Sequence, residues 1–199
     1  YALGAAHREH ASVVRFGENL ESFQGPLMDK EIHELERLLN NSKSGYAVLL
    51  GGAKISDKLN LIEKLLPKVE YLMVGGGMCF TLLKALGHEI GRSLLEESFI
   101  SKAEELLNSR FGKKIILPID FGVTDSIDSS VRENVKLDDF KNNHIGVDIG
   151  PQTVSSFRKI LKKSNNIFWN GPMGIFEKEA FSYGTKEITE IISNSSAYT

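Results

Sequence analysis

The chain has 199 residues, of which 41% are hydrophobic and 25% are charged; these values are close to the averages for globular proteins, and nothing in them indicates a disordered, collagen-like or membrane-spanning chain. The formal net charge of −2 excludes a strong overall field that would attract nucleic acid or an acidic surface, so an anion site must be built locally from lysines and backbone N–H groups. The single cysteine, Cys79, excludes an internal disulfide framework and a zinc site with several cysteines, and it fits a reducing compartment.

Short β-rich runs alternate along the chain with segments of helical periodicity. In chain order, the sequence predicts a helix at 29–39, a strand at 46–50, a helix at 55–66, a strand at 70–74, helices at 78–86 and 95–111, a strand at 114–117, a helix at 154–163, a strand at 166–169 and a helix at 180–193. The polar stretch 120–143 carries mixed signals, and we expect it to contain a loop and short strands.

Apolar strands separated by helices of ten or more residues favour right-handed βαβ crossovers and a parallel sheet. The predicted fold is therefore α/β, a three-layer αβα sandwich with a mostly parallel, Rossmann-like sheet. Ligands of such sheets bind beyond the carboxyl ends of the strands, at the loops that lead into helices. These loops are where the candidate site residues are expected.

The first predicted strand is followed by Gly51-Gly-Ala-Lys-Ile-Ser-Asp-Lys58. Glycine has no Cβ and lets the backbone approach a ligand closely, and a helix that begins near Ser56 would offer free N–H groups and the positive end of its dipole to an anion. Lys54 and Lys58 are four residues apart and would point along one side of that helix. The alternative is a tight turn with two solvated lysines. The loop is not a Walker motif.

The second predicted strand ends in Gly75-Gly-Gly-Met78. Three successive glycines lose much conformational entropy when they are ordered, and close approach of the backbone to a flat ring or a phosphate would justify that loss. The alternative is tight packing between the strand and the helix. The dinucleotide fingerprint Gly-x-Gly-x-x-Gly is not satisfied, because Phe80 occupies its last glycine position.

Polar side chains follow the last predicted strand, in the segment Phe168-Trp-Asn-Gly-Pro-Met-Gly-Ile-Phe-Glu177. At the strand end, the amide of Asn170 could hydrogen-bond a phosphate oxygen or could serve only as a turn former. Glu177 could accept hydrogen bonds from sugar hydroxyls or act as a first-turn helix acid. The two aromatic residues before Asn170 are expected in the core. A further loop, 146–151, is interpreted as the introduction to the next helix.

The sequence predicts no metal site. His7 and His10 are three residues apart, but no further histidine, cysteine or carboxylate cluster accompanies them. A structural pair is therefore favoured over a pair of metal ligands.

Taken together in this order and spacing, four motifs and the opening of the chain resemble phosphoglycerate kinase. The motifs are Gly51–Lys58, Gly75–Met78, Asp148-Ile-Gly-Pro151 and Trp169–Glu177. The opening Ala6-His-Arg-Glu-His-Ala-Ser12 resembles the stretch that closes the N-terminal domain of that family. Each glycine cluster alone is weakly specific, whereas the ordered set is specific, and the resemblance covers essentially the whole chain.

The resemblance implies a glycolytic, monomeric, cytoplasmic enzyme that moves a phosphoryl group between 1,3-bisphosphoglycerate and MgADP, giving 3-phosphoglycerate and ATP. In that family the C-terminal domain holds the nucleotide, the N-terminal domain holds the phosphoglycerate on a basic patch, and hinge bending brings them together. The resemblance assigns residues 1–14 to the end of the N-terminal domain, residues 15–40 to the hinge and interdomain helix, and residues 41–199 to the nucleotide-binding domain.

The resemblance also implies roles for single residues. Lys58 would contact the transferring phosphoryl group, Lys54 would support the nucleotide phosphates, and Arg8 would bind the phosphoglycerate; these three are the implied catalytic residues. The implied nucleotide-binding residues are, besides the two lysines, Gly75, Gly76, Gly77, Leu94 and Gly146 around the adenine, Asn170 and Pro172 near the phosphates, Glu177 at the ribose, and Gly52, Ala53 and Phe176.

The chain departs from the family at both ends. It ends at Ala197-Tyr-Thr199, where the family continues into a Gly-Gly-Gly-Asp loop whose aspartate binds magnesium, and it contains little of the phosphoglycerate-binding domain. We therefore expect this chain alone to bind ADP or ATP without transferring phosphate, and we expect no protein ligand for the metal within it. The alternatives are a non-catalytic nucleotide-binding module and a dinucleotide-dependent dehydrogenase, which the missing fingerprint disfavours.

Overall fold

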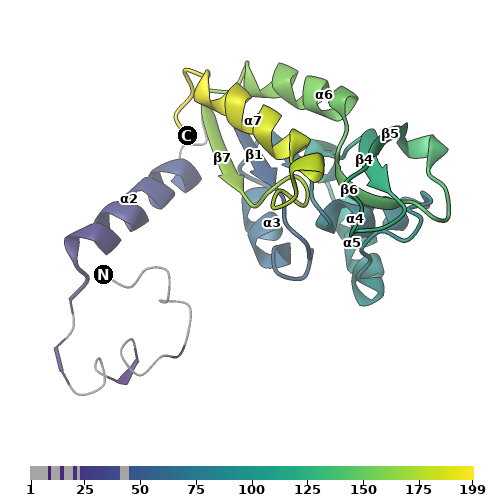
Figure 1. The fold of residues 1–199 in the computed structure, drawn as a ribbon. Helices are drawn as coiled ribbons and strands as arrows, with labels where there is room; N and C mark the ends of the chain where they lie inside the picture. Colours follow the sequence, from purple (N-terminus) through teal and green to yellow (C-terminus); the bar gives the residue numbers. More distant parts are fainter. Residues whose placement is uncertain (1–8, 10–13, 16–19, 22, 41–44) are drawn as a thin grey trace. The chain divides into compact units, whose positions relative to one another are not determined.

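The computed structural model describes residues 9, 14–15, 20–21, 23–40 and 45–199 (Figure 1). The predictions for His7, Arg8 and His10 fall outside these residues. The chain divides into two compact units, Tyr1–Asn41 and Ser42–Thr199, and each unit has its own structure.

The described part of the first unit contains helix α2, Pro26–Asn40. Its N-terminus lies three residues before the predicted start at residue 29. Pro26 fits the first helical position, because its missing N–H would have no partner there and its fixed φ is helical. Asp29 in the first turn and Arg37 in the last turn both have the charge that the helix dipole favours.

A four-stranded parallel sheet organises the second unit. Its strands, in the order β3-β2-β1-β7, are β3 (Ile115–Ile116), β2 (Tyr71–Val74), β1 (Tyr46–Leu50) and β7 (Asn166–Asn170). Leu50 pairs with Val74 on one side and with Asn170 on the other. The carboxyl ends of β1, β2 and β7 therefore finish level at one edge. The strand order reverses between β1 and β7, which is where open α/β sheets bind ligands.

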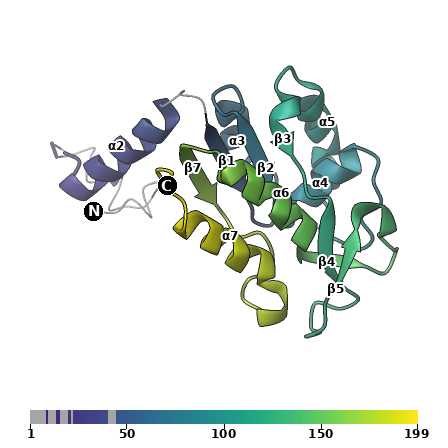
Figure 2. The same cartoon turned by 90° about the horizontal axis from the view of Figure 1, so that it is seen from above.

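Helices cover both faces of this sheet (Figure 2). On one side of the strands lie α6 (Pro151–Leu161) and α7 (Tyr183–Ser193), and on the other side lie α3 (Leu59–Leu65), α4 (Met78–Ala85) and α5 (Ile100–Asn108). All five residues of β1 are buried, as expected for a parallel strand with helices on both faces. The predicted three-layer α/β fold with a mostly parallel sheet is confirmed.

The side chains of β1 alternate between the two helical layers. Ala47 and Leu49 belong to a buried cluster that also contains Val154 and Phe157 of α6 and Ile188 of α7. Burying a side chain of the size of leucine or phenylalanine contributes about 1.5–3 kcal/mol. This cluster therefore holds α6 and α7 against the sheet, and with them the loops that precede these helices.

A second, antiparallel sheet lies beyond β3 in the chain. Its strands, in the order β5-β4-β6, are β5 (Glu133–Lys136), β4 (Asp120–Thr124) and β6 (Ile145–Ile149). The prediction of short strands within 120–143 is confirmed by β4 and β5. The interpretation of 146–151 as a loop was wrong for its first four residues. Residues 145–149 pair with β4, and their hydrophobic residues Ile145, Val147 and Ile149 stand at alternate positions, which is the pattern of a strand.

Several predicted helix boundaries differ from the structure. α3 begins at Leu59 and not at residue 55, because residues 55–58 form a turn in which the Ile55 carbonyl accepts the Lys58 N–H at 2.9 Å. α5 begins at Ile100 and not at residue 95. The 3₁₀ helices η2 (Glu97–Phe99) and η5 (Glu179–Phe181) directly precede α5 and α7 and account for part of these differences. Two further 3₁₀ helices, η3 (Gly112–Lys114) and η4 (Leu137–Asp139), adjoin strands β3 and β5.

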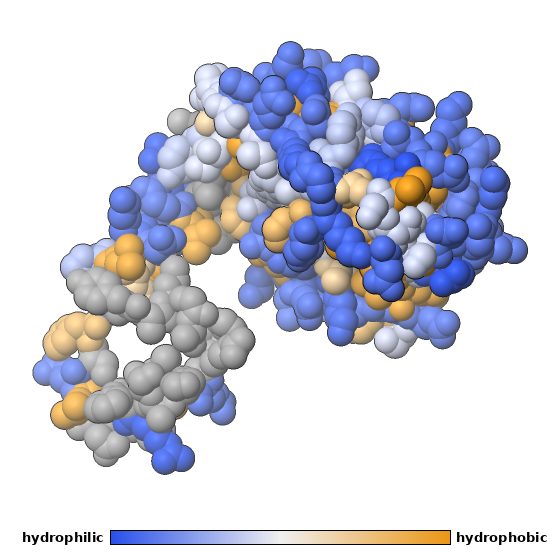
Figure 3. Space-filling model, in the orientation of Figure 1, coloured by the Kyte–Doolittle hydropathy of each residue, from blue (hydrophilic) through white to orange (hydrophobic). Residues whose placement is uncertain are grey.

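The surface of the second unit seen in Figure 3 is mainly hydrophilic, with small separate hydrophobic areas. Leu94 and Phe176 are among the large hydrophobic side chains that remain exposed, at 45% and 50%. Within the part of the chain that the structure describes, no helix combines the length and the apolar character needed to cross a membrane.

Candidate functional site

The loops that follow β1, β2 and β7 are joined by backbone hydrogen bonds. The Gly52 N–H donates to the Pro172 carbonyl at 2.9 Å, and the Gly76 N–H donates to the Met173 carbonyl at 3.0 Å. The Gly52 carbonyl in turn accepts the Met78 N–H at 3.1 Å. The three glycine-containing loops therefore converge at one edge of one sheet, as the sequence predicts for strands that end level.

Three glycines allow these loops to pack backbone against backbone. A Cβ on Gly51 would lie 2.0 Å from the Pro172 carbonyl oxygen, and a Cβ on Gly76 or Gly171 would lie 2.5 Å from the carbonyl oxygen of Gly52 or Gly51. Close contact between the backbones of these loops therefore requires glycine at these three positions. Gly52 differs, because its φ of +105° favours glycine while no atom lies within 4 Å of its absent Cβ.

A cavity of about 610 Å³ opens beside these loops, between the parallel and antiparallel sheets. Its size falls within the range of small-molecule sites. Nine of the implied nucleotide-binding residues line it: Gly52, Ala53, Gly76, Gly77, Leu94, Gly146, Pro172, Phe176 and Glu177. We call this cavity the inter-sheet pocket.

One wall of the inter-sheet pocket is aromatic and was not predicted from the sequence. Phe80 of α4 and Phe121 of β4 line the pocket with their ring centroids 5.1 Å apart. Gly146 of β6 lies directly against this wall, because a Cβ there would be 2.0 Å from the end of the Phe80 ring. From the sequence, Phe80 was considered only as the residue that replaces the last glycine of the dinucleotide fingerprint. Phe121 reaches Phe80 through the pairing of β4 with β6, which joins residues far apart in the sequence.

Lys58 and Asn170 contact each other at the edge of the pocket. The Lys58 Nζ donates to the Asn170 Oδ1, although the two residues are 112 positions apart. The Asn170 carbonyl also accepts the Gly51 N–H at 2.9 Å. Lys58 and Asn170, together with Lys54 and Gly75, are absent from the pocket lining. Of the predicted polar residues, Glu177 lines the pocket, whereas the two lysines and Asn170 are not part of its lining.

The prediction of free N–H groups near Ser56 was wrong for Ile55 and Ser56 themselves. The Glu96 Oε2 accepts the Ile55 N–H at 2.6 Å and the Ser56 N–H at 3.2 Å, and its Oε1 accepts the Ser56 hydroxyl at 2.6 Å. Partial desolvation raises the pKa of Glu96, but the hydrogen bonds from Ser56 and Ile55 and the charge of Lys54 outweigh it, so the pKa lies below its ordinary value. Lys54 and Lys58 therefore remain as the cationic groups that this loop offers.

Asp148, which also lines the pocket, belongs to a buried ion pair. The Asp148 Oδ2 accepts hydrogen bonds from the Arg132 guanidinium and from the Gly184 N–H, each at 2.7 Å. Burial raises the pKa of Asp148 to about 6, although the Gly184 N–H and the Arg132 charge oppose this shift. The pair connects β6 to the start of α7 and so joins the antiparallel sheet to the helical layer of the parallel one.

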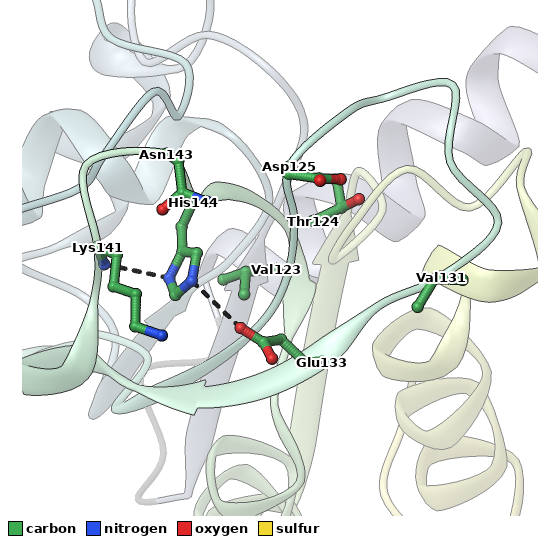
Figure 4. A pocket seen from close by; sticks show the side chains of 8 residues that line it. All are labelled: Val123, Thr124, Asp125, Val131, Glu133, Lys141, Asn143 and His144. Atoms are coloured by element: carbon green, nitrogen blue, oxygen red, sulfur yellow. Dashed lines mark hydrogen bonds and ion pairs between the residues drawn. The ribbon is translucent and has the colours of Figure 1, made fainter.

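A second, smaller cavity of about 280 Å³ lies around His144 (Figure 4). The His144 Nδ1 accepts the Lys141 N–H at 3.1 Å, and its Nε2 lies 3.2 Å from the Glu133 carboxylate. Both ring nitrogens are thus engaged, and the imidazole offers no free group to a ligand.

The described residues do not form a metal site of protein ligands. Among them, no group of three or more histidine, cysteine, aspartate or glutamate side chains is arranged to hold a metal ion. The inter-sheet pocket is lined by two carboxylates, those of Asp148 and Glu177, and the Asp148 carboxylate already accepts hydrogen bonds from Arg132 and Gly184.

Comparison with known proteins identifies the family. A family model described as phosphoglycerate kinase matches residues 1–199. The phosphoglycerate kinase of Salinispora arenicola is 47% identical over 199 residues, covering 100% of this chain and 50% of that protein. That of Thermus thermophilus is 44% identical over 195 residues, covering 96% of this chain and 50% of that protein.

Solved structures agree with this result. The phosphoglycerate kinase of Pyrococcus horikoshii matches with a TM-score of 0.85 and 31% identity, over 98% of this chain and 50% of that one. The enzyme of Coxiella burnetii matches with a TM-score of 0.82 and 37% identity, over 87% of this chain and 46% of that one. The chain spans about half the length of the curated relatives that it matches. On this evidence, the chain belongs to the phosphoglycerate kinase family.

Proposed function

We propose that this chain binds an adenine nucleotide in the inter-sheet pocket and serves as the nucleotide-holding part of a reversible phosphoryl transfer. In that reaction, 1,3-bisphosphoglycerate and ADP give 3-phosphoglycerate and ATP. The observation that carries the proposal is the convergence of three strand-end loops on one pocket, with Lys58 and Asn170 at its edge. Membership of the family supports kinase chemistry.

The pocket has an apolar part that suits a flat base. Leu94 and Phe176 are half-exposed at the lining, and they would bury apolar surface only when a ligand covers them. Gly77 and Gly146 let apolar side chains pack directly against the backbone, since a Cβ would lie 2.9 Å from Leu94 and 2.0 Å from the Phe80 ring. In this proposal the base lies among these residues. Gly75 and Gly76 would hold the loop after β2 in place beside the base.

The polar part suits phosphates. Phosphoryl transfer passes through a loose transition state with charge on peripheral oxygens, so catalysis needs positioned cationic groups and not a nucleophilic side chain. We assign Lys58 to the transferring phosphoryl group and Lys54 to the nucleotide phosphates. The Asn170 amide would hold the Lys58 ammonium before the nucleotide arrives and would then share the phosphate oxygens with it.

Two further assignments complete the proposed ligand contacts. Glu177 lines the pocket, and its carboxylate can accept hydrogen bonds from the ribose hydroxyls. Gly52, Ala53 and Pro172 would border the phosphates. We also propose that Arg8 is a phosphoglycerate ligand. Residues 1–14 would end the N-terminal domain, residues 15–40 would form the hinge and interdomain helix, and residues 41–199 would form the nucleotide-binding domain.

We propose that the nucleotide binds together with Mg²⁺, since Mg²⁺ is commonly held by substrate phosphates and only one or two carboxylates. The described residues form no group of three or more histidine, cysteine or carboxylate ligands that would hold the ion by themselves. We further propose a cytoplasmic monomer. Sedimentation equilibrium tests the monomer, and a mass twice that of the chain would contradict it.

Two measurements test the proposed function. Calorimetric titration of the 199-residue chain with ADP should show one site, and Lys58→Ala should weaken that binding more than it weakens the binding of adenosine. A coupled assay with 3-phosphoglycerate and MgATP then separates the two candidate roles. Binding without turnover supports a nucleotide-holding part, and turnover supports a complete kinase. Failure of the wild-type chain to bind ADP would contradict the proposal.

A further inference from the structure

Glu96 connects the lysine-bearing loop to a buried anchor in α4. Its backbone N–H donates to the Thr81 hydroxyl at 3.2 Å, and Thr81 is only 1% exposed. Its carboxylate accepts the N–H groups of Ile55 and Ser56 and the Ser56 hydroxyl. One residue thus links α4, which follows the second glycine loop, to the loop after β1.

The segment that Glu96 holds is the one between the two lysines. Lys54 directly precedes Ile55, and the Lys58 N–H closes the turn by donating to the Ile55 carbonyl at 2.9 Å. Lys58 occupies the N-cap position of α3, and no side-chain hydrogen bond caps this helix. The Ile55 side chain is buried and fixes the loop from the inside, while the Glu96 carboxylate fixes its backbone.

Glu96 itself is absent from the lining of the inter-sheet pocket, although Leu94, two residues before it, is part of that lining. Because the Glu96 carboxylate accepts the N–H groups of Ile55 and Ser56, these two groups are not free to bind an anion. The negative charge of the Glu96 carboxylate lies close enough to the Lys54 ammonium group to interact with it. The geometry therefore suits a residue that shapes the anion site from outside.

We infer that Glu96 is a positioning residue that holds Lys54 and Lys58 in the arrangement needed for the phosphate groups of the nucleotide. This inference rests on the proposed function. Glu96 acts through the turn at residues 55–58 and makes no contact with the ligand. Ordering the turn in advance removes a conformational cost that binding would otherwise carry.

Three variants separate this role from a general structural one. Glu96→Ala removes every contact of the carboxylate. Glu96→Gln keeps an acceptor for the two N–H groups and a donor for the Ser56 hydroxyl oxygen, so it should restore the arrangement without the charge. Glu97→Ala is the matched control, because it removes the same charge from the adjacent, exposed residue.

The experiment measures the affinity for ADP and for adenosine by calorimetry, and amide hydrogen exchange at Ile55 and Ser56. In Glu96→Ala, binding of ADP should weaken about tenfold while that of adenosine changes by less than about twofold, as expected when hydrogen bonds that order only the phosphate end are lost. Exchange at both amides should accelerate. Glu96→Gln and Glu97→Ala should behave like the wild type.

The remaining outcomes would overturn either this inference or the proposed function. Equal weakening of ADP and adenosine in Glu96→Ala, or unchanged ADP binding, would overturn the inference while leaving the proposed function intact. An equal loss in Glu97→Ala would assign the effect to net charge and would also overturn it. A wild-type chain that binds neither ligand would contradict the proposed function, and the phosphate role of Glu96 would fall with it.

Discussion

The Asp148 carboxylate and the Arg132 guanidinium are 2.7 Å apart, with side chains that are 0% and 11% exposed. Arg132 precedes β5, and Asp148 lies in β6 and also accepts the Gly184 N–H of α7. The Arg132 guanidinium lies 5.0 Å from the centre of the Tyr183 ring, beside that contact. The ion pair is thus the polar link between the antiparallel sheet and the helix that covers the parallel sheet, and it adjoins the inter-sheet pocket.

The pH dependence of stability should reveal this pair. Because burial raises the pKa of Asp148 from 3.8 to about 6, the folded state binds the proton more tightly than the unfolded state does. The stability that Asp148 contributes is then fully present below pH 4 and is lost as the pH rises through 6. The loss amounts to at most about 3 kcal/mol, at 1.36 kcal/mol for each pH unit between the two pKa values.

Urea unfolding of the wild type and Asp148→Asn between pH 4 and pH 7 measures this effect. The unfolding free energy of the wild type minus that of the variant should fall as the pH rises, since the asparagine does not titrate. Asp139→Asn, at an exposed position, provides the control and should give a nearly constant difference. A constant difference for Asp148→Asn as well would contradict the assigned pKa shift.

Asp120 of β4 caps the N-terminus of α6, and its removal should destabilise the fold. Its Oδ2 accepts the Gln152 N–H at 2.8 Å and its Oδ1 accepts the Thr153 N–H at 2.7 Å. Asp120 and Thr153 are 2% and 1% exposed, so the Thr153 N–H would lose its partner without gaining water. Asp120→Ala should cost about 1–3 kcal/mol of unfolding free energy. Asp138→Ala, at an exposed position, should cost much less, and equal losses would argue against the capping role.

A methyl group on Gly146 should disturb the aromatic wall of the pocket. The added Cβ would meet the Phe80 ring at 2.0 Å, and Phe80 is 3% exposed, so the ring would have to move. Gly146→Ala should lower the unfolding free energy by about 1–3 kcal/mol, as overpacking does in other cores, and should weaken ADP binding. Phe80→Leu in the same chain makes room for the methyl group. If the double variant binds ADP no better than Gly146→Ala, the steric explanation is incorrect.

The parallel sheet could be predicted because its signals are local. Residues 46–50 form an uninterrupted apolar run that ends in glycines, and the structure has β1 at Tyr46–Leu50. Strands buried on both faces carry this pattern whatever their neighbours are. The convergence of the glycine loops then follows from the rule that parallel strands end at one edge.

The features that the sequence did not predict depend on contacts between residues that are far apart in the sequence. The hydrogen bonds of Glu96 with the loop after β1 span about 40 residues, and nothing in the local sequence distinguishes Glu96 from its exposed neighbour Glu97. The start of α3 at Leu59 was missed for the same reason, since a carboxylate from elsewhere satisfies the N–H groups of the preceding turn. Residues 146–149 were predicted to be part of a loop but belong to β6, where Gly146 is required by the Phe80 ring.

The central claim is that the inter-sheet pocket is the nucleotide site. An NMR titration of the isotope-labelled chain with ADP tests it most directly, because each backbone N–H reports its own surroundings. We predict that the amide signals of Gly52, Gly77 and Gly146 shift together with one dissociation constant, while those of Asn143 and His144, in the smaller cavity, stay in place. Shifts confined to the smaller cavity, or no shifts at the three glycines at saturating ADP, would contradict the account.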